Sequence, residues 1–236
     1  MRKAVLSAII FIFFIFPTFV NSQETSFALP EQSLNKEDAT LAIERIKELQ
    51  KDIEAITARV SQKKSSKLTE KDIETEGTIT LKKPNLLYWE VEIPERVIIV
   101  VDGKRLWVYH PALKEVKREL LSRNVAARYT MDFFSSSMEM SIEKLEKRFE
   151  VAVYHPSDNY VFELRPKSKI AAKYLTVIYI WYREKDGVPV RFEVVGKKNN
   201  RTVTDLNKVS INPDIEKELF HFKVPEGVKI ISEDKK

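Results

Sequence analysis

The chain has 236 residues, no cysteine and only five glycines, with 43% hydrophobic and 32% charged residues. This is enough chain for one globular core, and it excludes a disulfide framework and a glycine-rich phosphate-binding loop. The 40 basic and 35 acidic residues leave a net charge of +5. Because acids and bases alternate along the chain, they indicate an ordinary solvated surface, and no nucleic-acid partner is expected.

The first 22 residues are typical of a secretory signal peptide. Arg2 and Lys3 precede an apolar run that begins at Ala4, and Val20-Asn21-Ser22 suits signal peptidase. No cysteine follows the run, so an acylated N-terminus is excluded. A retained anchor is the alternative, although Pro17 interrupts the run. We expect a cleaved signal peptide over 1–22, a flexible N-terminal segment over 23–34 and a single domain over 35–236.

The domain is predicted to begin with a long amphipathic helix. Asn35 is a good N-cap residue, and Glu37 and Asp38 suit the first turn. Apolar residues then recur every three or four positions, which predicts a helix of about 24 residues. These positions are Ile43, Ile46, Leu49, Ile53, Ile56 and Val60.

From Ile73 onward the apolar period changes to two, which predicts consecutive strands. Asp102-Gly103, Asp186-Gly187 and Asn199-Asn200 are expected to form turns between them. Short loops favour an antiparallel meander that curls into a partly closed barrel with helices on one face, an α+β fold. Strands are expected near 78–81, 88–93, 97–101, 106–109, 150–154, 160–165, 174–183, 188–195 and 202–211.

The region from Ala126 to Phe149 is the second candidate for a covering helix. It combines Met and Phe residues with a Ser135-Ser136-Ser137 interruption. Such residues suit a soft apolar lining, and a helix packed permanently on the sheet is an equally good interpretation.

No catalytic or metal-binding pattern is present in the sequence. His110, His155 and His221 lie far apart and outside any metal-ligand spacing. No nucleophile elbow, nucleotide-binding motif or acid–base pair is found. We therefore expect a protein that is not an enzyme and needs no cofactor or metal.

Two parts of the chain, the segment over 76–116 and the C-terminal tail, carry a distinctive order of prolines and aromatic residues. The segment has a strand ending at Lys83-Pro84, an aromatic strand reaching Trp89, and Asp102-Gly103 followed by Leu106-Trp107-Val108-Tyr109. The tail, Phe220 to Val228, follows the pattern F-x-F-x-x-P-x-G-V. Together, the segment and this closing pattern resemble the LolA family of periplasmic carriers of outer-membrane lipoproteins.

This resemblance implies an incompletely closed antiparallel sheet of about eleven strands with a helical lid over its concave face. It implies a periplasmic monomer that binds the acyl chains of lipoproteins in an apolar cavity. The implied partners are acylated lipoproteins, an inner-membrane ABC transporter that releases them and an outer-membrane receptor. The lid latch falls on Lys83, where the family usually has Arg, and the residue at the cavity mouth is Leu87.

Alternation and the resemblance together predict the residues that line the acyl-chain cavity. Alternation alone does not show which strand face is concave, because a one-residue slip reverses every side chain. For each residue, ordinary core packing is the alternative. The predicted lining is Leu81, Leu87, Trp89, Val91, Ile99, Val101, Trp107, Tyr109, Met131, Phe133, Phe134 and Met138.

Two other functions remain open from the sequence. A periplasmic or membrane-anchored sensor could bind lipids or lipoproteins through the same fold and regulate a partner. An enzyme acting on lipid or envelope polymer would need convergent polar residues in the cavity, and the sequence displays none.

Overall fold

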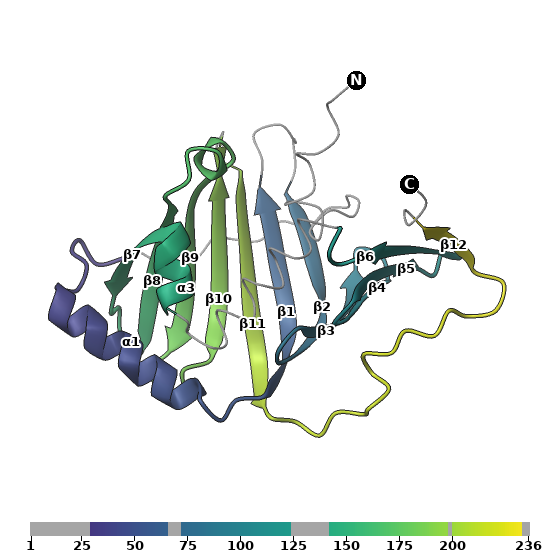
Figure 1. Ribbon diagram of the computed structural model, residues 1–236, viewed down its shortest axis with the longest axis horizontal. Helices are drawn as coiled ribbons and strands as arrows, with labels where there is room; N and C mark the ends of the chain where they lie inside the picture. Colours follow the sequence, from purple (N-terminus) through teal and green to yellow (C-terminus); the bar gives the residue numbers. More distant parts are fainter. Residues whose placement is uncertain (1–28, 66–71, 124–141, 198–199, 233–236) are drawn as a thin grey trace.

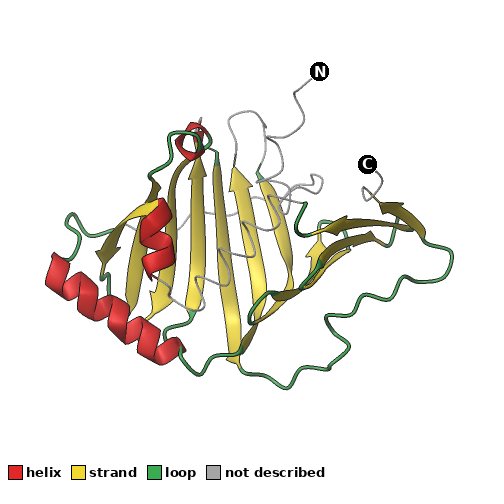
Figure 2. Ribbon diagram, viewed as in Figure 1, coloured by secondary structure: helices red, strands yellow, loops and turns green. Residues whose placement is uncertain are grey.

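The computed structural model describes residues 29–65, 72–123, 142–197 and 200–232. These residues form one twelve-stranded sheet with helices against it (Figures 1 and 2). The helices are α1 (Lys36–Gln50), α3 (Ile142–Arg148) and the 3-10 helix η2 (Ala171–Lys173). The strands are β1 (Ala55–Ser65), β2 (Ile73–Lys82), β3 (Leu86–Ile93), β4 (Val97–Asp102), β5 (Arg105–His110), β6 (Glu115–Leu120), β7 (Phe149–Tyr154), β8 (Asn159–Pro166), β9 (Leu175–Arg183), β10 (Pro189–Gly196), β11 (Arg201–Ile211) and β12 (Lys229–Ser232). Within those ranges, no helix combines the length and the apolar character needed to cross a bilayer.

Helix α1 begins where the sequence predicts and ends earlier. The Asn35 side chain accepts a hydrogen bond from the Asp38 amide at 2.9 Å, as expected of an N-cap. The helix ends at Gln50, so the prediction that it continues to Val60 is wrong. Ile56 and Val60 belong to β1, where they are buried in alternation with partly exposed neighbours. Their spacing of four fits both a helix and a strand, and β-branched residues favour the strand.

The strand order shows that β1 lies in the middle of the open sheet. The order is β12-β6-β5-β4-β3-β2-β1-β11-β10-β9-β8-β7. The chain thus builds one half outward from β1 to β6 and the other half inward from β7 to β11. Strand β11 then pairs with β1 in antiparallel fashion and joins the halves.

The predicted open, curled sheet is confirmed, with one difference in pairing. Strands β6 and β12 were not expected individually, and they pair in parallel, with Ile230 opposite Val116. Figure 1 shows β3 to β6 turning away from the plane of β7 to β11 and β1, and the C-terminal segment running from β11 around to β12. The sheet is therefore mixed and does not close on itself.

One face of the sheet carries the hydrophobic core and is called the inner face below. It bears Leu81 and Leu87 from one half and Phe162 and Ile180 from the other, all at most 2% exposed. Ile46 of α1 belongs to the same cluster. The opposite side is called the outer face. The two halves of the sheet and the helix therefore share one core.

The second predicted helical region is only partly described. Its last residues form α3, which ends at Arg148, and β7 begins at Phe149. Leu145 of α3 is buried in the core cluster. Met131, Phe133, Phe134 and Met138 lie outside the described residues.

Candidate functional site

The apolar surface of the inner face is built by strand register. Leu81 pairs with Leu87, Leu87 with Val101, and Val101 with Leu106, which makes one apolar row across four strands. Residues directly opposite one another on antiparallel strands present their side chains on the same face. The row therefore forms a continuous wall.

A second row runs beside the first. Ile79 pairs with Trp89, Trp89 with Ile99, and Ile99 with Val108. A further pair, Val91 and Val97, extends the wall along the strands. The predicted lining residues that these rows bring together are Leu81, Leu87, Trp89, Val91, Ile99 and Val101, each at most 4% exposed.

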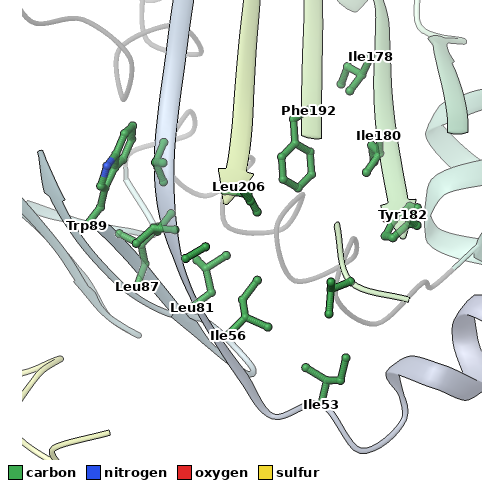
Figure 3. Close-up of a cluster of buried hydrophobic side chains, with 14 of the residues drawn as sticks. Ile53, Ile56, Leu81, Leu87, Trp89, Ile178, Ile180, Tyr182, Phe192 and Leu206 are labelled. Atoms are coloured by element: carbon green, nitrogen blue, oxygen red, sulfur yellow. The ribbon is translucent and has the colours of Figure 1, made fainter. Parts of the chain in front are cut away.

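The other half of the sheet contributes its own apolar row to the inner face. Phe192 pairs with Ile180, and Ile180 with Phe162. The Phe162 ring meets the Tyr182 ring edge-on, with centroids 5.1 Å apart. Figure 3 shows Trp89, Leu87 and Leu81 on one side and Phe192, Ile180 and Tyr182 on the other, with Ile56 and Ile53 between them. The apolar alternation in the sequences of β8 to β10 indicates that these side chains share one face, although the predicted lining did not include them.

Trp107 and Tyr109 lie on the outer face, away from the other predicted lining residues. Val101 is opposite Leu106, so the side chains at 106 and 108 face inward and those at 107 and 109 face outward. Both aromatic rings pack on Phe222 of the C-terminal segment, with centroids 5.6 Å away in each case. The strand was correctly predicted, but the prediction placed residues 107 and 109 on the inner face, where the structure has residues 106 and 108.

Asp102 stabilises the hairpin that leads into this strand. Its carboxylate accepts hydrogen bonds from the amides of Lys104 and Arg105 at 2.9 and 2.7 Å, and from Trp107 Nε1 at 3.1 Å. Burial by itself raises the pKa of Asp102, but these three hydrogen bonds outweigh it and hold the pKa below its ordinary value. The ionised carboxylate therefore stabilises the turn.

The C-terminal end of α1 is attached to both halves of the sheet. Lys83 Nζ lies 3.4 Å from the carbonyl oxygen of Gln50, the last residue of the helix. The Gln50 side chain donates a hydrogen bond of 2.7 Å to the Gly187 carbonyl in the β9–β10 turn. A cation at a helix C-terminus is favoured by the helix dipole. The predicted latch residue thus contacts the helix beside the apolar rows.

A group of polar side chains on the inner face was not predicted from the sequence. Gln62 and Lys64 of β1 and Thr204 of β11 are 3%, 8% and 8% exposed. The Gln62 amide donates a hydrogen bond of 2.8 Å to the Thr204 hydroxyl. The alternation of β1 carried the signal, because positions 62 and 64 continue the buried series of 56, 58 and 60. The predicted helix included Ile56 and Val60 and ended before Gln62, so this series was not recognised as one strand.

The histidines are not gathered into a metal site. His155 lies 3.1 Å from a Glu184 carboxylate oxygen and stacks on the Tyr160 ring at 4.3 Å. His221 lies on the exposed C-terminal segment, with Nδ1 3.3 Å from the Lys217 carbonyl. In the ranges that the structure describes, no three metal-ligating side chains come together.

Comparisons of sequence identify the family of the chain, and a comparison of structures matches its fold. Two curated relatives are outer-membrane lipoprotein carrier proteins. The protein from Azotobacter vinelandii is 28% identical over 81% of this chain and 88% of its own length. The protein from Hahella chejuensis is 25% identical, with the same coverage of both chains. The fold matches the crystal structure of an uncharacterized conserved protein from Thermus thermophilus, with a TM-score of 0.52 and 10% identity over 83% of this chain and 99% of that one. The family described as outer membrane lipoprotein carrier protein LolA matches residues 51–223, most of the chain. The chain therefore belongs to the LolA family.

Proposed function

We propose that the chain is a carrier that binds the acyl chains of lipoproteins on its inner face and moves them from the inner to the outer membrane. The observation that carries this proposal is the apolar wall itself. Rows from β2 to β5 and from β8 to β10 meet at β1 and β11 within one continuous cluster. An open sheet with a shared apolar face offers hydrocarbon a surface without forming a closed barrel.

The energy of acyl binding requires delivery by direct contact. Burying each methylene gains about 0.8 kcal/mol, so a chain of about 14 methylenes represents about 11 kcal/mol. Each 1.4 kcal/mol slows escape into water about tenfold. A carrier of this kind must receive and release its cargo at the apolar sites of partners. As the family relationship implies, we propose an ABC transporter in the inner membrane as donor, a receptor in the outer membrane as acceptor, and a periplasmic location between them.

The predicted site residues enter this proposal in three groups. The six buried residues that the apolar rows bring together form the wall. Lys83 acts as the latch that holds α1 beside it, supported by its contact with the Gln50 carbonyl. The remaining proposed lining residues, which come from the sequence prediction, are Met131, Phe133, Phe134 and Met138.

Mass spectrometry of the intact protein purified from the periplasmic fraction tests the proposal. Recovery of proteins with a diacyl or triacyl cysteine bound to the chain is the expected result. A preparation free of acylated species would contradict it. Recovery of a membrane regulator with no acylated protein would also contradict it and would favour the sensor.

A further inference from the structure

The polar group on the inner face interrupts the apolar series along β1 and the neighbouring strand β11. Its buried members are Gln62, Lys64 and Thr204, and the name polar island is used for these three residues. Thr75 is paired with Gln62, and Thr202 with Lys64, so two half-buried hydroxyls border the island. Burying polar groups costs free energy unless they are hydrogen-bonded. A wall that only contacted hydrocarbon would be more stable with apolar residues at these positions.

Two apolar paths lead away from the island. One crosses the sheet from Thr204 to Phe192, Ile180 and Phe162, and Phe162 lies three strands from Thr204, about 14 Å. This path starts beside the island at the same level of the sheet.

The other path follows β1 and then crosses the opposite half. Val60 and Ala58 are the next inward residues after Gln62, and Ala58 is opposite Ile79, which is opposite Trp89. Figure 3 shows Trp89 and the Phe192–Ile180 pair on opposite sides of the cluster. The arrangement is a polar centre with two diverging apolar arms, which has the same form as a glycerol that carries two acyl chains.

We propose that the polar island binds the ester carbonyl groups of an acylated glycerol, with one acyl chain along each apolar path. This inference rests on the proposed function. The Lys64 amine and the Thr204 hydroxyl supply donors, and the Thr204 oxygen already accepts from Gln62. Ester oxygens only accept hydrogen bonds, so donors are the chemistry that the cargo needs.

The state of Lys64 agrees with a neutral acceptor. Burial lowers the pKa of Lys64, because the charged form loses hydration in this environment. A site occupied by a phosphate group would instead favour the charged amine, because a neighbouring anion raises the pKa of an amine. The other two members of the island, Gln62 and Thr204, are uncharged.

The test compares two synthetic lipopeptides that differ only in these carbonyls. One carries a diacylglyceryl cysteine with ester-linked chains, and the other carries the same chains in ether linkage. We expect the wild-type chain to bind the ester form about tenfold more tightly, as for hydrogen bonds in a dry site. Lys64→Met should remove most of this preference, and the nearly isosteric Thr204→Val should reduce it about threefold.

Lys63→Met is the matched control. Lys63 is the neighbouring residue on β1, faces the opposite side of the sheet and lies 3.1 Å from Asp72. It should keep the full preference for the ester form. The same comparison with ester- and ether-linked phosphatidylglycerol identifies the source: equal preference supports a site for any glycerolipid, and preference only among the lipopeptides supports a site for glyceryl cysteine.

Two outcomes separate this inference from the proposed function. Tight binding of both lipopeptides with no preference, or a preference that survives in both Lys64→Met and Thr204→Val, overturns the polar-island proposal and leaves the carrier intact. Failure of the wild-type chain to bind either lipopeptide overturns the carrier as well.

Discussion

At the scale of single residues, Asp102 holds together the turn between β4 and β5. Its carboxylate holds two backbone amides and the Trp107 indole. Leu106 then faces the core, while Trp107 faces outward. Asp102 therefore stabilises a turn that leads into a strand with Leu106 on the inner face and Trp107 on the outer face.

Asp102→Asn should therefore destabilise the fold by about 1 kcal/mol at neutral pH, because an amide oxygen is a weaker acceptor than a carboxylate. The folded-state pKa of Asp102 lies below its ordinary value, so its stabilising contribution is complete above that ordinary value. The contribution is lost as pH falls through the folded-state pKa. Urea unfolding of both proteins should show a difference at pH 7 that shrinks as the pH falls through the folded-state pKa of Asp102. Equal free energies of unfolding at pH 7 would show that the hairpin does not depend on this charge.

At the scale of elements, α1 is held at its C-terminal end by two separate hairpins. Lys83 approaches the Gln50 carbonyl from the β2–β3 turn, and the Gln50 side chain reaches Gly187 in the β9–β10 turn. The helix end therefore links the two halves of the open sheet. Loosening either contact should free the helix without removing the core beneath it.

Lys83→Met is predicted to increase hydrogen exchange of the last turn of α1 about three- to tenfold, because a helix-terminal cation contributes roughly 0.3–1 kcal/mol and a hydrogen bond a similar amount. Amide exchange measured by mass spectrometry checks this. Lys82→Met is the control, since Lys82 is the adjacent exposed lysine. Equal exchange in both variants would mean that Lys83 does not secure the helix.

Sequence patterns predicted which elements exist better than where they end or which of their side chains face the core. The N-cap at Asn35 and the Asp102-Gly103 hairpin follow from local chemistry, and both are present in the structure. The end of α1 did not follow, because Ile56 and Val60 fit either period until pairing with β2 and β11 selects the strand. Gln62 and Lys64 of the polar island lie on that same strand, so missing β1 also concealed these two candidates.

At the scale of the whole molecule, the C-terminal segment fastens the outer face. It leaves β11, places Phe222 between Trp107 and Tyr109, and ends by pairing β12 with β6 (Figure 1). The chain thus covers the outer aromatic side chains with its own tail. The inner face then remains as the apolar surface assigned to cargo.

Phe222→Ala should expose the two outer aromatic rings and destabilise the fold by about 1–2 kcal/mol, because Phe222 is only half-buried. In a variant whose only tryptophan is Trp107, the emission should shift to longer wavelength. An unchanged spectrum would indicate that the tail does not cover this ring in solution.

The most direct test of acyl binding on the inner face uses the three tryptophans of the chain. A Trp107→Phe/Trp181→Phe variant keeps only Trp89 on the inner face, and a Trp89→Phe/Trp181→Phe variant keeps only Trp107 on the outer face. A lipopeptide with bromine atoms along its acyl chains quenches tryptophan on contact. We predict strong quenching of Trp89 and little of Trp107 when each variant is saturated with this lipopeptide. Quenching of Trp107 with Trp89 unaffected would contradict the account, because the acyl chains would then lie on the wrong face of the sheet.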